Sequence, residues 1–323
     1  MTQPTLPVIP KATLGHTGIV TTRLGLGTAA WPHQIPYEQV IEMLETCFAV
    51  GIRYIDMAPV YMSEDIVGHA LQELARQSAV PPDLVLVTKA GSYSRADPDF
   101  GAVQQRFHAD TIYRSVERSL KRTGVDSLHI VHIHDPGEDQ LSQVFAKDGA
   151  LAALQDLKSQ GVIKAIGMGT LSLTTLLTAA ESGGFDVLQI FHTYTLLNTT
   201  AKDRLFPVAL AKGISILNSA PFSGYILATG TTPDAKYNYA PASPDVIAAT
   251  QRLEAICAQK GVDLATAALA FSYQAPEVDV TVVASGKPER VAGWVQAFDA
   301  PLTAADFDEM LAAAGGSYPV RRE

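Results

Sequence analysis

Short apolar runs and longer amphipathic stretches alternate along most of this chain. The short runs are rich in Val, Ile and Leu and end at glycine or polar residues, which is typical of buried strands. The longer stretches carry apolar residues three or four positions apart, which predicts helices with one buried face. The pattern therefore predicts an α/β protein.

After a small hairpin at 14–22, the alternation predicts eight strands, each followed by helix. The strands are expected at 24–28, 54–56, 84–89, 128–134, 163–167, 187–191, 214–217 and 280–283. The helices are expected at 37–50, 63–76, 110–123, 151–159, 173–182, 202–212, 246–260, 264–273 and 288–297, the last being the final helix. Pro59 argues against a helix directly after the second strand, and Ser63 is the expected N-cap of the next one.

These strands are almost continuously apolar, which favours a parallel sheet covered on its outer face. Eight strand–helix units within 323 residues fit a (β/α)8 TIM barrel, a fold that takes about 250 residues. A doubly wound sheet is the alternative, but no GxGxxG follows the first strand. We expect one domain over 1–323, with 1–10 as an extended arm and long loops at 92–109 and 221–243 on the C-terminal face.

Composition narrows the class of protein. Hydrophobic residues make up 47% and the net charge is −9, which favours a globular protein and argues against a nucleic-acid surface. Cys47 and Cys257 stand alone in amphipathic stretches, so we expect buried thiols and no metal site. No signal peptide or membrane-spanning run is evident, so a cytoplasmic protein is expected. The oligomeric state is left open.

Polar side chains stand at the ends of three consecutive predicted strands. Asp56 ends the second, Lys89 the third and His134 the fourth, while Tyr61 lies on the loop after Asp56. In a barrel such strand ends collect in one pocket. His132 has the same strand parity as His134 but lies one layer deeper, so a hydrogen-bonded interior histidine is expected there.

Each residue also has an ordinary structural interpretation: a turn-capping carboxylate, a packing aromatic, a surface cation and a turn histidine. Together they form a general acid/base. A phenol has a pKa near 10, and a nearby ammonium lowers that pKa by favouring the phenolate. In this interpretation Asp56 holds Lys89, Lys89 tunes Tyr61, and His134 orients a carbonyl or hydroxyl group. Such a device suits redox chemistry with a hydride-carrying cofactor.

The segments that carry these residues resemble the signature blocks of the aldo-keto reductases. They are 51–61 (GIRYIDMAPVY), Thr88-Lys89 and 133–136 (IHDP), and the likeness runs from about Leu14 to Phe298. The resemblance implies that Tyr61 transfers the proton, with Asp56, Lys89 and His134 completing a catalytic tetrad. It also implies a bound NAD or NADP over the barrel mouth and a small carbonyl or hemiacetal substrate.

Segments in the second half are similar to one branch of that family, which contains the D-threo-aldose (L-fucose) 1-dehydrogenases, L-galactose dehydrogenases and pyridoxal 4-dehydrogenase. They are 192–198 (HTYTLLN), 220–230 (APFSGYILATG) and 237–239 (YNY). Members of this branch oxidise a cyclic hemiacetal to a lactone, so the same reaction is implied here. A general aldehyde or ketone reductase, and a non-catalytic cofactor-sensing subunit, stay as alternatives. So does an aldolase with Lys89 as a Schiff base.

The resemblance also assigns residues to the cofactor. They are Thr28, Asp56, Gln189, Ser219, Phe222, Ser223, Gly224, Ser285, Gly286, Lys287 and Arg290. Gln189 would bind the nicotinamide amide, backbone donors of 222–224 the pyrophosphate, and 285–290 the adenosine end.

This chain also departs from the family pattern. Departures are Met62 for glycine, Gly169-Thr170 for Ser-Asn, Ser219 for a stacking tyrosine, Ala284 for proline and Trp294 for asparagine. The sequence therefore leaves the preference for NAD or NADP open. For the substrate walls we expect Trp31 and Tyr93, with packing of the outer loop as an equal alternative for Tyr93.

Overall fold

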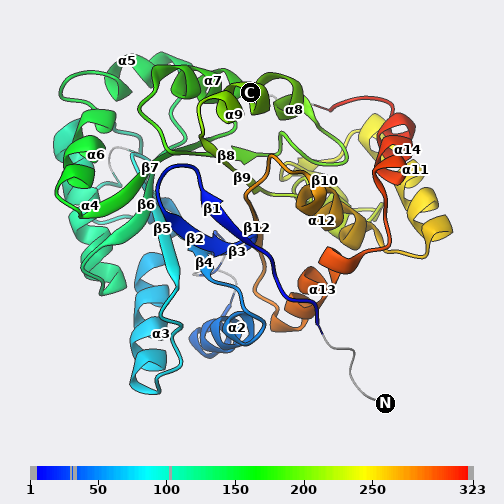
Figure 1. The fold of residues 1–323 in the computed structure, drawn as a ribbon, viewed down its shortest axis with the longest axis horizontal. Coiled ribbons are helices and arrows are strands. Elements are labelled where there is room, and N and C mark those ends of the chain that lie inside the picture. The colour runs from blue at the N-terminus through cyan, green and yellow to red at the C-terminus, as the bar shows by residue number, and fades with distance from the viewer. Residues whose placement is uncertain (1–5, 30, 32–34, 102–103, 319–323) are drawn as a thin grey trace.

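The computed structural model describes residues 6–29, 31, 35–101 and 104–318. Its centre is a closed barrel of eight parallel strands in the order β12-β3-β4-β5-β6-β7-β8-β9 (Figure 1). The strands are β3 (Leu24–Gly27), β4 (Tyr54–Asp56), β5 (Val85–Ala90), β6 (Leu128–His134), β7 (Ile163–Thr170), β8 (Val187–Phe191), β9 (Ser215–Ser219) and β12 (Val280–Ala284). The predicted (β/α)8 barrel is confirmed.

Helices surround the barrel (Figure 1). They are α2 (Tyr37–Ala49), α3 (Glu64–Arg76), α4 (Ala109–Thr123), α5 (Leu141–Val144), α6 (Ala150–Ser159), α7 (Leu173–Ser182), α8 (Thr200–Arg204), α9 (Phe206–Ala211), α10 (Ile226–Thr229), α11 (Pro244–Lys260), α12 (Leu264–Gln274), α13 (Val291–Gln296) and α14 (Ala304–Ala314). The helices α4, α6, α7 and α12 pack against the strands, whereas α14 packs against α11, and the strand ends are left to form the site.

Two separate apolar clusters follow from the alternation of side chains along the strands. Tyr54, Val87 and Ile130 belong to an inner cluster that fills the barrel. Ile55 and Val131, one position away, belong to the outer cluster beneath the helices. Because parity fixes direction, every second residue toward the C-terminal end of a strand also points into the barrel.

A hairpin closes the N-terminal end of the barrel. It consists of β1 (Lys11–Leu14) and β2 (Ile19–Thr22), which pair antiparallel as predicted. Leu14 and Ile19 are buried with the inner cluster, so the hairpin seals the barrel floor. Among the described residues, the hairpin leaves the C-terminal end of the barrel open to receive a ligand in its interior.

Several boundaries differ from the prediction. The predicted helix at 202–212 is two helices, α8 and α9, because Pro207 lacks the N–H that would continue the first. β7 runs on to Thr170, beyond the predicted end at 167. The final helix is α14, which the prediction missed, although Thr303 and Asp306 form a capping box at its start.

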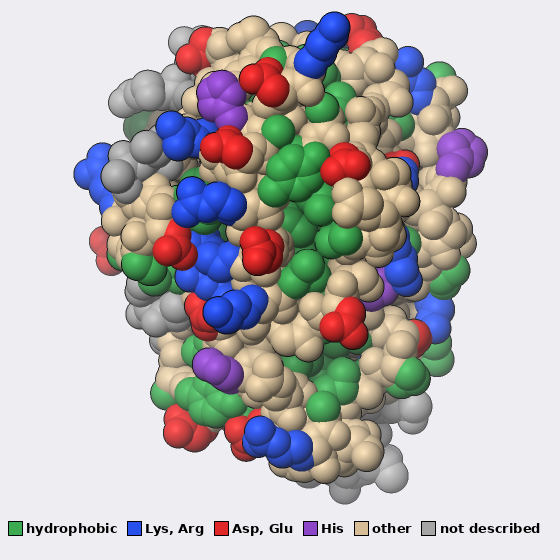
Figure 2. All heavy atoms as spheres, turned by 90° about the vertical axis from the view of Figure 1, so that its left-hand side faces the viewer, with side chains coloured by type: hydrophobic (Ala, Val, Ile, Leu, Met, Phe, Trp, Pro, Cys, Tyr) green, Lys and Arg blue, Asp and Glu red, His purple; other side chains and the backbone are tan. Residues whose placement is uncertain are grey.

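Two further observations bear on the class of protein. Cys47 and Cys257 are buried and unpaired, as expected. Within the described residues, no helix is long and apolar enough to cross a membrane. On the face shown in Figure 2, Lys and Arg side chains are interspersed with Asp and Glu side chains.

Candidate active site

Three predicted residues converge at the C-terminal end of the barrel. Asp56 is the last residue of β4, Lys89 lies near the end of β5 and His134 is the last residue of β6. Each has the parity of an inner-cluster residue on its own strand: Tyr54, Val87 and Ile130 respectively. All three side chains therefore point into the barrel mouth.

Asp56 and Lys89 form a buried ion pair, with side chains 5% and 2% exposed. The Lys89 ammonium donates to both Asp56 carboxylate oxygens at 2.6 Å and to the Met57 carbonyl at 3.0 Å. An ammonium has three protons, so these contacts use all of them. The predicted contact between Asp56 and Lys89 is confirmed.

Tyr61 stands beside this pair on a 3₁₀ turn, η1 (Pro59–Tyr61). The expectation that Pro59 prevents a helix here is wrong, because proline is tolerated at the first helical position, where its missing N–H is not needed. The Lys89 nitrogen lies 4.9 Å from the centre of the Tyr61 ring, and the His134 ring meets it edge-on at 5.6 Å. The ring is thus close to both a cation and an imidazole.

The pKa of Tyr61 is raised well above 10, opposite to the prediction. Burial of the hydroxyl is the largest cause, and the negative charge of Asp56 comes next. Lys89 does not offset them, because its protons and most of its charge are committed to Asp56. Burial also lowers the pKa of Lys89, against the raising effect of Asp56. The phenol of the resting protein is therefore a proton donor at neutral pH.

His132 is fully buried one layer below His134, as predicted. Its hydrogen-bond partner among the described residues is the Met168 backbone, and this contact falls outside the usual geometric limits. Burial and the neighbouring Lys89 hold its pKa well below the usual value, so the ring is neutral. A Cβ at Gly167 would lie 2.1 Å from its Nδ1, which explains the glycine there.

Gln189 and Ser219 offer polar atoms that fit a nicotinamide amide. The Gln189 amide nitrogen donates to the Ser219 hydroxyl at 2.7 Å, and its oxygen is a buried acceptor without a partner among the described residues. A buried acceptor of this kind is costly unless a donor reaches it. A carboxamide N–H is a suitable donor, so these residues fit the cofactor that the resemblance implies.

Other predicted cofactor residues are engaged by the protein itself. The Thr28 hydroxyl contacts the Asp56 carbonyl at 2.9 Å and the Ser63 hydroxyl at 2.8 Å. Ser63 occupies the N-cap position of α3, as predicted, but its side chain makes no capping bond. The Ser223 amide donates to the Ala220 carbonyl at 3.1 Å and is not available as the expected pyrophosphate donor in this conformation. Phe222 and Gly224 flank it on the same turn.

The expected adenosine end lies after β12. The Ser285 hydroxyl accepts from the Lys287 amide at 3.1 Å, and the carbonyl of Gly286 accepts from Gln39. Lys287 and Arg290 are exposed. The Trp31 indole donates to the Ser285 carbonyl at 3.0 Å and is 1% exposed, so Trp31 fastens this turn to the loop after β3.

Tyr93 is buried within its own loop, with 2% of its surface exposed. Its ring stacks on Phe100 at 4.3 Å, and its hydroxyl accepts from the Gly91 amide at 3.1 Å. This environment favours loop packing, the alternative to a substrate wall.

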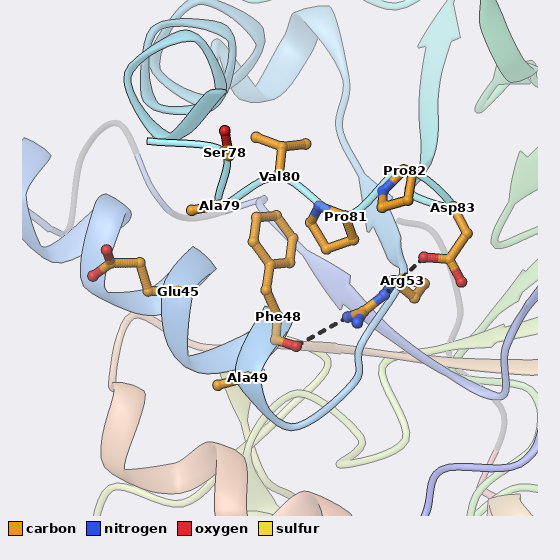
Figure 3. Close-up of a pocket in the computed structure, with 10 residues that line it drawn as sticks. All are labelled: Glu45, Phe48, Ala49, Arg53, Ser78, Ala79, Val80, Pro81, Pro82 and Asp83. Atoms are coloured by element: carbon orange, nitrogen blue, oxygen red, sulfur yellow. Dashed lines mark hydrogen bonds and ion pairs between the residues drawn. The ribbon is translucent and has the colours of Figure 1, made fainter. Parts of the chain in front are cut away.

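A surface pocket lies at the opposite end of the barrel (Figure 3). It is lined by Phe48, Arg53, Pro81 and Asp83 among others. Arg53 precedes β4, whereas Asp56 ends it, so the pocket is on the N-terminal side. The Arg53 guanidinium is bound by Asp83 at 2.9 Å and by the Phe48 carbonyl at 3.0 Å, which makes it part of the fold.

Two residues at the site were not selected from the sequence. Tyr239 is among the causes that raise the pKa of Tyr61, through the negative charge that its phenolate would carry. Glu64 is fully buried beside β5 and accepts from the Thr88 hydroxyl at 2.6 Å. A tyrosine after Asn238, where a tight turn favours glycine, is the signal that could have identified Tyr239.

Comparison with known proteins agrees with this geometry. The model of the Aldo/keto reductase family matches residues 23–314. The chain belongs to the aldo/keto reductase family. It is therefore an oxidoreductase, and enzymes of this family generally use NAD(P)H and act on small carbonyl compounds.

Individual members of the aldo/keto reductase family resemble the chain at modest identity. Pyridoxal 4-dehydrogenase of Microbacterium luteolum is 27% identical, covering 87% of this chain and 90% of its own. D-threo-aldose 1-dehydrogenase of Pseudomonas sp is 28% identical, covering 85% and 88%. A crystal structure from Pseudomonas aeruginosa assigned to the aldo-keto reductases superposes with a TM-score of 0.65 at 25% identity, covering 89% and 96%.

Proposed function

We propose that this enzyme oxidises a cyclic hemiacetal to a lactone with NAD or NADP, and that Tyr61 is its general acid/base. The carrying observation is the proximity of the Tyr61 ring to both the Lys89 ammonium and the His134 imidazole. A phenol near a cation and a hydrogen-bonding ring can exchange a proton with a substrate oxygen. The similarity to aldose and pyridoxal dehydrogenases supports the substrate class.

The proton and hydride leave the anomeric centre by different routes. The bound nicotinamide supplies the hydride acceptor. Tyr61 takes the proton of the anomeric hydroxyl as the carbon–oxygen double bond of the lactone forms. His134 orients that oxygen, and Asp56 holds Lys89 in place beside the ring. Reduction of an aldehyde is the same sequence in reverse, with Tyr61 donating the proton.

The cofactor would be held at two places. Gln189 and Ser219 would bind the nicotinamide amide, because their buried polar atoms lie together at the ends of adjacent strands. The turn at 285–290 would bind the adenosine end, where the exposed Lys287 and Arg290 can reach a 2′-phosphate. Replacing both Lys287 and Arg290 with neutral residues distinguishes NADP from NAD. The variant should lose affinity for NADP and keep its affinity for NAD, because recognition of the 2′-phosphate needs the two charges and NAD binding does not.

General carbonyl reduction is the second candidate. It is favoured by the raised pKa of Tyr61, which keeps the phenol protonated and ready to donate at neutral pH. A Schiff-base aldolase needs an uncharged, accessible Lys89. The pairing of all three Lys89 protons speaks against it. The cofactor-sensing subunit is the alternative without turnover.

An absorbance assay for reduced nicotinamide tests the proposal. The protein is mixed with NAD or NADP and with L-fucose, L-galactose, D-arabinose or pyridoxal, and the reverse reaction is run with simple aldehydes. The proposal expects reduced cofactor to form with at least one cyclic hemiacetal. Turnover of aldehydes alone establishes the reductase alternative, and binding of cofactor without any turnover establishes the sensor. Borohydride trapping of a substrate on Lys89 would overturn the acid/base assignment.

A further inference from the structure

A two-residue turn at the barrel mouth carries an unusual residue. The strands β10 (Lys236–Tyr237) and β11 (Ala240–Pro241) pair antiparallel, with Tyr237 opposite Ala240. Asn238 and Tyr239 form the turn between them, with φ of 49° and 66°. Both values are left-handed, as in a type I′ turn, whose second position strongly favours glycine. A tyrosine at that position costs stability, so its presence calls for a compensating role.

Contacts on both sides fix this turn in place. The Asn238 amide donates to the Ser223 carbonyl at 3.2 Å. The Tyr237 hydroxyl donates to the carbonyl of Tyr318, whose amide in turn donates to the Leu197 carbonyl at 2.8 Å. Tyr239 is thus held by its neighbours in a strained conformation while its own side chain stays 55% exposed.

The Tyr239 ring lies over the interior of the barrel. It stacks on Phe191 with ring centres 6.3 Å apart and planes 22° from parallel. Phe191 ends β8 and shares the parity of Gln189 and the inner-cluster residue Val187, so it points inward just above Gln189. The same ring meets His192 edge-on at 6.0 Å.

His192, which lies behind Phe191 and Tyr239, is uncharged. It is fully buried, and burial lowers its pKa to about 4, so the imidazole is neutral at physiological pH. Its backbone is also left-handed, with φ of 60°. Phe191 and Tyr239 present a neutral aromatic surface with the buried His192 behind it, and we call these three residues the aromatic wall.

We propose that Tyr239 determines substrate specificity: the aromatic wall receives the ring of an uncharged cyclic substrate whose reacting carbon lies at Tyr61. This deepens the proposed function and rests on it. A flat face suits the apolar C–H face of a sugar ring or the face of a pyridine ring, whereas a short open-chain aldehyde is too small to contact the wall and Tyr61 together. Phe191, on which Tyr239 stacks, points inward at the end of β8, which supports this placement.

The test compares a ring substrate with an open-chain substrate in the same direction. Benzaldehyde and methylglyoxal are reduced with NAD(P)H, and the ratio of their kcat/KM values is measured alongside KM for L-fucose oxidation. Tyr239→Gly should lower the ratio about tenfold, the worth of one aromatic contact, and should raise KM for L-fucose. Tyr239→Phe should keep the ratio, because it keeps the ring face.

Stability separates a recognition role from a structural one. Tyr239→Gly gives the turn its preferred Asn-Gly sequence, so its Tm should equal or exceed that of the parent protein. Tyr113→Ala is the matched control: Tyr113 is exposed on α4, in the outer ring of helices, and donates to Asp156 of α6. It should leave both substrates and KM unchanged.

An unchanged ratio in Tyr239→Gly, or an equal loss of the ratio in Tyr239→Phe, would overturn the role of the wall while hemiacetal oxidation stands. Conversely, a parent protein that reduces both aldehydes but oxidises no hemiacetal would overturn the proposed lactone-forming reaction. In that case the ratio of the kcat/KM values for benzaldehyde and methylglyoxal still tests the role of the aromatic wall, so the two failures are distinguishable.

Discussion

The two sides of the barrel mouth are built in opposite ways. On one side, Lys89 has all its protons bonded to Asp56 and Met57 and is 2% exposed. On the other, His192 is buried with neither ring nitrogen hydrogen-bonded in the described structure, and Tyr239 is strained and exposed. The first side has its charged groups paired within the protein, whereas the second presents the exposed ring of Tyr239. This difference suggests that the ion-pair side performs the chemistry and the aromatic side selects the substrate.

The largest effect is expected from Tyr61→Phe. Loss of the hydroxyl removes proton transfer, so kcat should fall by about a hundred- to ten-thousand-fold. The ring and its contacts with Lys89 and His134 remain, so cofactor binding, measured by fluorescence titration, should be unchanged. Turnover close to that of the parent protein would show that the proton passes through another group.

Breaking the ion pair should cost stability as well as activity. Lys89→Met leaves the Asp56 carboxylate buried without its partner, which is expected to cost about 3–5 kcal/mol of unfolding free energy. The double variant Lys89→Met/Asp56→Leu should recover most of that loss, because no buried charge is left unpaired. Its activity should stay low. Chemical denaturation and the nicotinamide assay measure the two effects.

The exposed pair Lys11–Asp83 provides the control for this experiment. Its side chains are 56% and 47% exposed, so Lys11→Met should change the unfolding free energy by about 0–1 kcal/mol. If Lys89→Met were equally mild, the pair at the site would not be held as tightly as its distances imply.

The raised pKa of Tyr61 predicts opposite pH dependences for the two directions. Oxidation needs the phenol to accept a proton, and below its pKa the phenolate fraction rises tenfold with each pH unit. The kcat/KM for oxidation should therefore increase with pH throughout the range in which the protein stays folded, while reduction should be flat near neutrality. A plateau in oxidation between pH 7 and 8 would mean that the pKa is lowered when substrate and cofactor bind.

The smallest effect is expected beside Tyr61. Met62 has φ of 57°, a conformation that glycine adopts without strain, so Met62→Gly should stabilise the protein by about 0.5–1 kcal/mol. The opposite substitution, Gly51→Met, should destabilise the protein by about 1 kcal/mol, because Gly51 has φ of 97° although there is open space at its Cβ position. Thermal denaturation measures both, and a Met62→Gly variant that loses stability would show that the methionine side chain packs favourably enough to outweigh its strain.

The spacing of apolar residues and the alternation of side chains along each strand were sufficient to predict the barrel and the convergence of Asp56, Lys89 and His134. Both patterns are local, so they can be seen in the sequence of a single strand or helix. The pKa of Tyr61 was predicted in the wrong direction, since no sequence pattern shows how deeply its hydroxyl is buried or how close it lies to the Asp56 carboxylate. Tyr239 was missed as a site residue for a similar reason. Its place over Phe191 depends on two strands of two residues each, which are too short to have a recognisable period.

The division of labour between the two sides can be tested by a single comparison. The kcat/KM values for benzaldehyde and methylglyoxal are measured in Tyr61→Phe and in Tyr239→Gly. Tyr61→Phe should lower both values by the same large factor and leave their ratio unchanged, whereas Tyr239→Gly should change the ratio about tenfold. If both variants changed the ratio to the same extent, or neither did, the separation of chemistry from substrate selection would be contradicted.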